Sequence, residues 1–470
     1  MINPFSLITI LWIGRIFFIK GKERRLIYLI PLTFFYESFL EVGYFLRFGN
    51  IEIGYAFFVN LFLFVYLLFS LIKETIPKQF FLAGMLLVGA GMLGNILLVF
   101  FPTQVRTANI NISWDNKIVL PGLIFEKIHL TSFNLLNLFY LVTYIMLFIV
   151  IVSVFKKESP KLVVRSLKKM TDFILIIGIG ELISKYLFRS DVFNTIVNTI
   201  FGISESTYVE VTARGSGFLL QGLTQESSHY VYVLFILFFV ILANFILTKQ
   251  RSDLYRLASL LLLLAVSMSF SSLIYFVAII HIVLLWKFRN MRIEKKILWG
   301  VLQLAILLVL VFLVTQVLPE LVKELSVTGF WGRRIRSVFE EISIVTSGRW
   351  RQSSHSLEWS NRVRLLSIYE NAKVFLLRPI FGFGLGSVVS HSSTMMLLSG
   401  GGVVFALIWA RFNFLLGRLK VTYEYLIVIV VFLAVNVFNS LSFRPFFDIS
   451  AIIFSLSIVI IFGLKEGSYE

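Results

Sequence analysis

A first short motif places an arginine beside small residues, a combination suited to binding an oxyanion. Arg214 is followed by a Gly-Ser-Gly tripeptide that contains Ser216 and Gly217, and Glu226 comes shortly afterwards. Backbone without side chains gives an anion close approach, and the guanidinium supplies a planar set of hydrogen-bond donors. A motif this short is more often an ordinary glycine turn beside a solvated arginine.

A second basic motif opens a stretch with helical periodicity. Arg362 and Arg364 come first, and apolar side chains then recur at helical spacing, at Leu365, Leu366, Ile368, Ala372, Phe375 and Leu376. This pattern predicts an amphipathic helix on a membrane surface, with both arginines at the N-terminal end, where anions are favoured. A surface helix with solvated arginines fits the same pattern.

A glycine-rich turn and a single histidine follow this predicted helix. Pro379 and the segment Gly382–Gly386 break the helix and turn the chain. His391 is then the only titratable side chain between Arg378 and Arg411. A neutral imidazole can accept a proton from a hydroxyl group, although a lone histidine at the end of a span is more often structural. With no Asp, Glu or second His nearby in sequence, a metal site is not expected here.

The composition indicates what must hold these residues in place. An apolar share of 58% and a mean hydropathy of +0.88 exclude a soluble protein of 470 residues. Cysteine is absent, which excludes disulfides and thiolate metal sites. The first residues show no small-residue cleavage site, so a cleaved signal peptide is not expected.

Apolar windows predict an all-α, polytopic helical membrane protein with about 12 to 13 spans in a single integral membrane domain, residues 1–470. The predicted spans are 3–19, 26–46, 53–72, 79–101, 131–154, 171–188, 229–248, 257–270, 273–288, 297–318, 395–412, 422–441 and 446–463. The spans at 257–270 and 273–288 are also compatible with one interrupted helix. No internal repeat and no second soluble domain are visible in the sequence.

The distribution of positive charge assigns a side to each loop. The formal net charge is +17, and basic residues gather between spans at Lys20–Arg25, Lys156–Lys169, Lys249–Arg256 and Lys287–Lys296. Such clusters are typical of cytoplasmic loops next to anionic lipid, so the charge does not indicate nucleic acid. The alternating segments are then outside, at 47–51, 102–129, 189–228, 318–394 and 442–445. Two of these, 189–228 and 318–394, are long enough to be functional loops.

The second long outer loop is unusually basic for its predicted side. Residues 318–394 carry ten Lys or Arg against six Asp or Glu. Basic residues are normally scarce on the outer face of a membrane. An anionic ligand is the expected reason for placing them there.

Together, these motifs resemble the O-antigen polymerase/O-antigen ligase superfamily of membrane glycosyltransferases. The resemblance runs from Arg214 to Arg411 and rests on the order of motifs: Arg-x-Ser-Gly-Phe, Asn-Arg, a helix, Pro-x-Phe-Gly-x-Gly-x-Gly and His-Ser. The sequence departs from the pattern at Ser227, where a proline is frequent, and after Ser392, where the usual aromatic residue is missing. Arg362 and Arg364 also compete for one position of the pattern.

The resemblance implies a GT-C-like, metal-independent glycosyltransferase without a cofactor. It acts on undecaprenyl-diphosphate-linked oligosaccharides, as donor and as acceptor, at the outer face of the bacterial cytoplasmic membrane. Arginines from both outer loops would hold the diphosphate, which corresponds to Arg214 and to Arg362 or Arg364, and His391 would serve the acceptor. The resemblance also suggests substrate binding by neighbouring residues, namely Ser216, Gly217, Glu226, Arg378, Gly384 and Gly386.

The expected activity is therefore the polymerisation of lipid-linked repeat units into O-antigen, capsule or exopolysaccharide. Expected partners are these substrates, the lipid bilayer and a chain-length regulator protein. A ligase that moves the finished glycan to a lipid A core or another acceptor would share the same donor site. A secondary transporter is a further alternative, suggested by acidic residues near or within spans, namely Glu37, Glu41, Asp172 and Glu181.

Overall fold

The structure of the protein is a computed structural model. It describes residues 4–39, 44–48, 51–71, 78–107, 117–120, 123–156, 158–190, 192–201, 220–224, 227–267, 270–288, 291–292, 294–295, 298, 359–390, 392–415, 428, 431 and 449–463.

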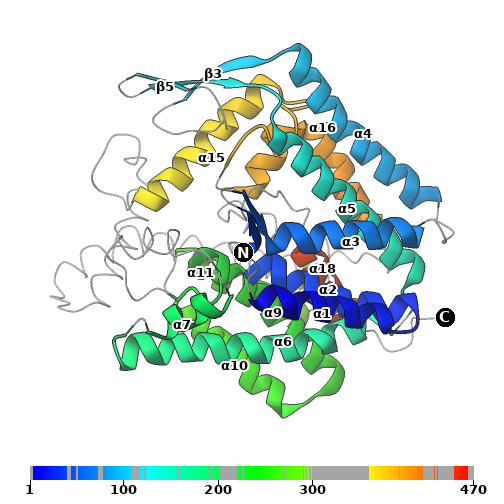
Figure 1. Ribbon diagram of the computed structural model, residues 1–470, viewed down its shortest axis with the longest axis vertical. Helices are drawn as coiled ribbons and strands as arrows, with labels where there is room; N and C mark the ends of the chain where they lie inside the picture. The colour runs from blue at the N-terminus through cyan, green and yellow to red at the C-terminus, as the bar shows by residue number, and fades with distance from the viewer. Residues whose placement is uncertain are drawn as a thin grey trace.

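These residues are mostly helical, and the helices pack side by side in one body (Figure 1). The helices are α1 (Pro4–Phe18), α2 (Lys22–Phe39), α3 (Tyr55–Leu71), α4 (Lys78–Phe100), α5 (Ser132–Val154), α6 (Ser159–Leu182), η1 (Ile183–Leu187), α7 (Val192–Phe201), α9 (Ser227–Thr248), α10 (Arg251–Val266), α11 (Phe270–Lys287), α15 (Trp359–Leu377), α16 (Ser393–Leu415) and α18 (Ile449–Gly463). Four of them, α4, α5, α9 and α16, contain stretches long and apolar enough to cross a membrane. The prediction of a helical chain with membrane-crossing helices is confirmed to that extent.

Two small antiparallel sheets interrupt the helical pattern, and the sequence did not predict them. The expected span at 26–46 is wrong at its end, because α2 stops at Phe39 and residues 44–48 form the strand β1 (Tyr44–Phe48). This strand pairs with β2 (Ile51–Gly54) in an antiparallel arrangement, with Phe48 opposite Ile51. In the predicted outer loop at 102–129, β3 (Thr103–Thr107), β4 (Lys117–Leu120) and β5 (Leu123–Ile128) form a sheet in the order β3-β5-β4.

Other predicted boundaries shift as well. The predicted span at 171–188 begins too late, because α6 starts at Ser159 and includes most of the basic cluster Lys156–Lys169. The windows at 257–270 and 273–288 correspond to two helices, α10 and α11. Almost all of the predicted spans at 297–318 and 422–441 lie outside the described residues.

Helix α9 forms the centre of the helical body. It packs against α6, α10, α11 and α18, and its residues from Tyr230 to Ala243 are buried. A helix that is apolar on every side is expected at such a central position. By contrast, α1 and α4 expose many large apolar side chains, as expected of helices that face lipid.

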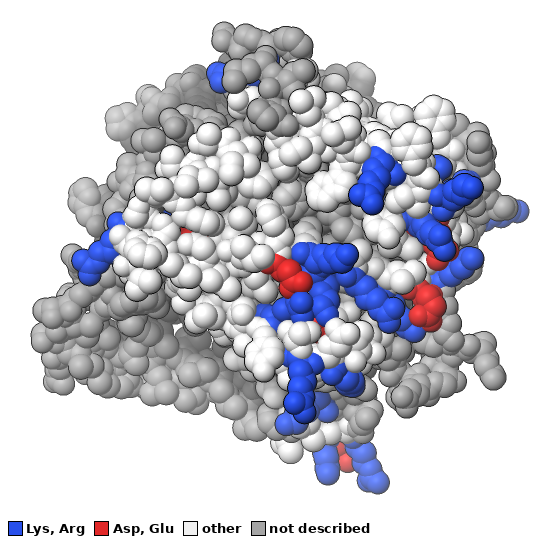
Figure 2. Space-filling model, turned by 60° about the horizontal axis from the view of Figure 1, so that its bottom comes forward, with Lys and Arg blue, Asp and Glu red and all other residues white. Residues whose placement is uncertain are grey.

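Three of the four predicted cytoplasmic clusters contact one another. Lys156 Nζ is 3.8 Å from the Glu23 carboxylate in the first cluster, and Lys168 Nζ is 2.9 Å from Asp253 in the third. Lys and Arg side chains accordingly gather on one face of the molecule (Figure 2). Two predicted outer segments also meet, because Arg378 donates hydrogen bonds to Thr103 Oγ1 and to the carbonyl oxygen of Phe101. Segments that the charge pattern assigns to one side thus contact each other.

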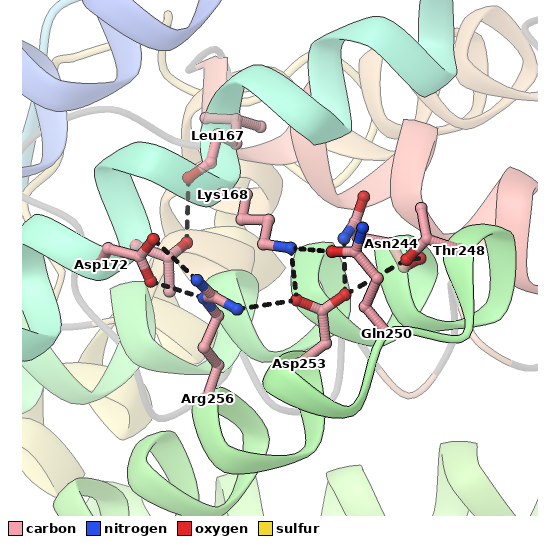
Figure 3. A network of polar contacts seen from close by, with 9 residues as sticks. Leu167, Lys168, Asp172, Asn244, Thr248, Gln250, Asp253 and Arg256 are labelled. Atoms are coloured by element: carbon pink, nitrogen blue, oxygen red, sulfur yellow. Dashed lines mark hydrogen bonds and ion pairs between the residues drawn. The ribbon is translucent and has the colours of Figure 1, made fainter.

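A polar network on the basic side joins α6, α9 and α10 (Figure 3). The fully buried Asp253 accepts from Asn244 Nδ2 at 2.6 Å and forms ion pairs with Lys168 and Arg256. Arg256 also bonds both oxygens of Asp172, at 2.5 and 2.9 Å. Hydrogen bonding to Asp172 raises the pKa of the Arg256 guanidinium above its ordinary value. The two carboxylates and two cations balance in charge, and the pairing compensates the fully buried charge of Asp253.

Candidate functional site

The predicted amphipathic helix exists as α15, and its buried face is polar. Ser367, Glu370 and Asn371 are buried on it together with Val374, whereas Leu376 of the predicted apolar stripe is 71% exposed. A helix is thus present where one was predicted, but it turns polar groups towards the protein, and its position on a membrane surface stays a prediction. Buried polar groups are retained only where they find partners, so the partners of this face define the site.

These partners come from the segment that leads to position 391 and from α16. Ser367 Oγ lies 3.0 Å from Ser390 Oγ, and Asn371 Nδ2 donates to the carbonyl oxygen of Val389 at 3.0 Å. Ser399 Oγ, in α16, donates to Asn371 Oδ1 at 3.1 Å. We call this group of residues (Ser367, Asn371, Val389, Ser390 and Ser399) the α15 junction. Its side chains fix α15 against the chain immediately before position 391.

The glycine-rich turn after α15 fills a break in α16. Gly402 has φ 71° inside α16, which interrupts the helical hydrogen bonds. The carbonyl oxygens of Pro379 and Ile380 accept from the backbone N–H groups of Val403 and Val404, and Phe383 N–H donates to the carbonyl oxygen of Ser399. Broken helices are tolerated at membrane depth only where such groups are satisfied, and here the turn satisfies them.

Three asparagines form the seat of this turn. Asn134 of α5 donates to the carbonyl oxygen of Leu385 at 2.9 Å and to Asn95 Oδ1 of α4 at 3.3 Å. Gly384 and Gly386 have φ of 87° and 82°, and a Cβ on them would overlap Asn95 and Asn137 respectively. Both glycines therefore have a packing role against α4 and α5. Their predicted part in substrate binding stays a prediction.

Arg378 is held by protein groups at the start of the same turn. Its guanidinium donates to Phe101 and Thr103 and lies 4.7 Å from the centre of the Phe383 ring. Burial lowers the pKa of Arg378 below its ordinary value. These contacts give Arg378 a structural role, which ties the turn to the α4–β3 connection, and substrate binding by this residue also stays a prediction.

Helix geometry separates the two competing arginine positions. Positions 364 and 371 of α15 are seven residues apart, close to two full turns at about 3.6 residues per turn. Positions 362 and 371 are nine residues apart, about two and a half turns, which is the opposite face. Position 364 therefore falls on the face of α15 that carries Ser367 and Asn371, within one turn of Ser367.

The remaining predicted site residues lie outside the described part of the chain. These are Arg214, Ser216, Gly217, Glu226 and His391, together with the side chains of Arg362 and Arg364. The described residues on either side of His391, Ser390 and Ser392, are both buried. Through Val389 and Ser390, the α15 junction brings the segment that precedes His391 in the sequence to the helix that carries position 364.

Glu370 is a feature of the site that sequence reasoning missed. Its Oε1 accepts from Lys373 Nζ at 2.9 Å, whereas the buried Oε2 has no hydrogen-bond partner among the described residues. A buried carboxylate oxygen without a partner can accept a hydrogen bond from a hydroxyl group. The available signal was an acidic residue at 370 within the helical pattern, three positions before a lysine.

The acidic residues that suggested transport are engaged locally. Glu37 accepts from the backbone N–H of Ile449, Asp172 pairs with Arg256, and Glu181 pairs with Lys185. Glu41 lies outside the described residues. Each of the three described carboxylates thus has a partner that explains its position without a transported ion.

Comparison with known proteins identifies no relative of this chain. The sequence matches no protein-family model, no curated protein and no solved structure.

Proposed function

We propose that the chain is a polysaccharide polymerase, a membrane glycosyltransferase that uses undecaprenyl-diphosphate-linked repeat units as donor and acceptor. The observation that supports it best is the α15 junction. Its bond between Ser367 and Ser390 joins the helix of the arginine motif to the segment of the lone histidine. Chemically complementary groups, a diphosphate binder and a proton acceptor, would then act at one place.

In the proposed reaction, an acceptor hydroxyl oxygen attacks the anomeric carbon of the donor glycan. The bond between this carbon and the diphosphate oxygen breaks, and undecaprenyl diphosphate leaves with the bonding electron pair. The acceptor hydroxyl proton passes to the imidazole of His391, which is neutral at physiological pH in its ordinary state. Arg214 and one arginine of the second loop stabilise the negative charge of the leaving diphosphate.

We assign the second-loop role to Arg364 rather than to Arg362. Position 364 shares a face of α15 with Ser367 and Asn371, and position 362 belongs to the opposite face. A diphosphate bound beside position 391 must lie on the face that meets the junction. We therefore expect Arg364 to bind the donor and Arg362 not to bind it, so a substitution of Arg362 is the matched control for a substitution of Arg364.

The proposed location is the outer face of the bacterial cytoplasmic membrane, with a chain-length regulator as an expected protein partner. Four helices that can cross a membrane and one strongly basic face support this location. The two long outer loops would meet the lipid-linked substrates at the membrane surface, where their headgroups lie.

The decisive experiment is elongation of a defined lipid-linked repeat by the purified protein. We expect a ladder of polymers from the wild type, and a loss of rate of about 10²–10³-fold in Arg364→Ala, because one charge-assisted contact to the leaving group is gone. Arg362→Ala should stay within a few-fold of wild type, and His391→Gln should lose about 10²-fold or more. Equal loss in both arginine variants would overturn the choice of Arg364.

Absence of any polymer from the folded wild-type protein would contradict the polymerase. Transfer of the glycan in one step to a lipid A core, without a ladder, would instead identify the ligase activity, which uses the same donor.

A further inference from the structure

A single buried carboxylate holds several groups at the end of α6. Glu181 is fully buried and lies just before η1, a π-helical turn of the kind often found at functional sites. Its Oε1 accepts from Lys185 Nζ at 2.7 Å and from Asn194 Nδ2 at 3.2 Å. The backbone N–H groups of Gln221 and Gly222 donate to the same carboxylate, the latter to Oε2 at 2.7 Å.

The groups that donate to Glu181 come from both ends of the first long outer loop. Asn194 lies near the beginning of the first long outer loop, and Gln221 and Gly222 lie near its end. Both ends of the intervening stretch, residues 195–220, are therefore bound to one side chain. Fixing the two ends of a segment restricts the conformations open to the chain between them. We call Glu181, Lys185, Asn194, Gln221 and Gly222 the loop clamp.

Stability alone does not explain the charge in the loop clamp. Glu181 and Lys185 are almost completely buried, with side-chain exposures of 1% and 6%. A buried ion pair is often no more stabilising than apolar residues of the same volume. A carboxylate, however, can accept hydrogen bonds from two consecutive backbone N–H groups, which an apolar side chain does not offer. Binding the loop end is thus the specific property of Glu181.

The end of the loop also packs against Tyr230, on the side opposite Glu181. Gly222 has φ 57°, and a Cβ at this position would lie 2.5 Å from a ring carbon of Tyr230. The Tyr230 hydroxyl in turn packs against Gly178, one turn before Glu181 on α6. The turn at Gly222 is therefore enclosed between the carboxylate of Glu181 and the ring of Tyr230, and only glycine fits there.

We propose that Glu181 is a positioning residue for glycan transfer: it joins the two ends of the first outer loop, the segment whose sequence contains Arg214. This inference rests on the proposed function for the reaction, but its structural part is independent of any substrate. Small displacements of a binding group are costly in catalysis, because transition-state contacts depend on correct geometry.

The test compares Glu181→Gln, Lys185→Met and the double variant Glu181→Gln/Lys185→Met. The first single variant weakens the clamp and leaves Lys185 without its charged partner. Lys185→Met leaves the carboxylate with its backbone donors. The double variant has no buried charge imbalance, so its thermal stability should return towards wild type, which separates positioning from simple ion-pair stability.

Two readouts are needed. Limited trypsin cleavage after Arg214, followed by mass spectrometry, reports on the loop without substrate and should accelerate about tenfold in both variants that lack Glu181. Glycan transfer should be about tenfold or more slower in these same two variants, with kcat reduced and little change with Lys185→Met. A double variant with wild-type cleavage and wild-type transfer would overturn the proposal and leave Glu181 as half of an ion pair.

The two proposals fail in different ways. If the wild-type protein transfers no glycan, the role in glycan transfer is overturned together with the proposed function. The cleavage comparison then still decides whether Glu181 joins the ends of the loop. If wild-type transfer is normal and cleavage does not respond to Glu181, only the loop clamp is refuted.

Discussion

Ser367 and Ser390 meet hydroxyl to hydroxyl at 3.0 Å, and both are buried. They belong to α15 and to the segment before position 391, respectively. This pair connects the two motifs that the sequence separates by more than twenty residues. Substitution of these two serines therefore tests the α15 junction directly.

Replacing either serine by alanine should destabilise the protein by about 1 kcal/mol, because the buried hydrogen bond between the two hydroxyls is lost. The double variant Ser367→Ala/Ser390→Ala should cost less than the sum of the single changes. Chemical denaturation of the purified protein gives the three values and the coupling between them. Strict additivity would show that the two hydroxyls do not interact.

Asn134→Ala should destabilise the fold by about 1–3 kcal/mol, because the carbonyl oxygen of Leu385 and the Thr131 groups that bond Asn134 lose their buried partner. Asn60→Ala is the matched control. Asn60 is also a buried asparagine in an apolar helix, but among the described residues its amide bonds only the carbonyl oxygen of Ala56 one turn earlier. Thermal unfolding in detergent should rank Asn134→Ala well below the control, and equal effects would remove the role of the asparagine seat.

Gly402→Ala should prevent normal folding or lower the unfolding temperature strongly. Its φ of 71° disfavours any side chain, and a Cβ would overlap the backbone of Ile380. Gly89→Ala, in α4, is the control, because the space around it is open and alanine favours a helix. Yield of monodisperse protein and unfolding temperature measure the difference. A tolerated Gly402→Ala would mean that the break in α16 is not required.

Asp253→Asn should cost about 3–5 kcal/mol, since two buried or half-buried cations lose their shared carboxylate. Asp172→Asn should cost clearly less, because its side chain is 41% exposed and water screens the loss. Denaturation curves at low and high salt distinguish the two sites, as only the exposed pair should respond to ionic strength. The reverse order of stabilities would contradict the geometry of Figure 3.

The sidedness of the chain can be measured with single cysteines, since the native sequence has none. Ser206→Cys and Ser354→Cys, in the two predicted outer loops, should react with membrane-impermeant thiol reagents in intact spheroplasts. Arg251→Cys, on the basic side, should react only after lysis. Protection of either outer probe in intact cells would exclude an outer site.

The sequence allowed the helices to be predicted where apolar runs are long, as in α5 and α9, because the run itself identifies a buried or lipid-facing helix. It failed at Tyr44–Phe48, where aromatic and apolar residues fit a span and a strand equally well. The strands of the 102–129 segment were also missed. A polar loop and a short sheet can have similar sequences and differ in whether their backbones form hydrogen bonds with a neighbouring strand.

In the candidate site, too, local features could be predicted from the sequence and contacts between distant residues could not. The glycine turn and the helix after Arg362 were predictable, since breakers and helical spacing are local signals. The polar seat of Asn134 was not, because a lone asparagine in an apolar span gives no indication of a partner 251 positions away. Glu181 was predicted to be a charge near or within a span. Its hydrogen bonds to the backbone N–H groups of Gln221 and Gly222 could not be predicted, because every residue other than proline has such a group.

The break in α16 also has a consequence for the order of assembly. Its exposed backbone groups are satisfied by residues 379–383, fewer than 25 positions earlier, so both partners leave the ribosome within seconds of each other. By contrast, α4 and α5 with their asparagines are made long before. The turn and the broken helix can thus pair as a small hairpin first, and docking onto Asn134 is then a single step between two preformed units.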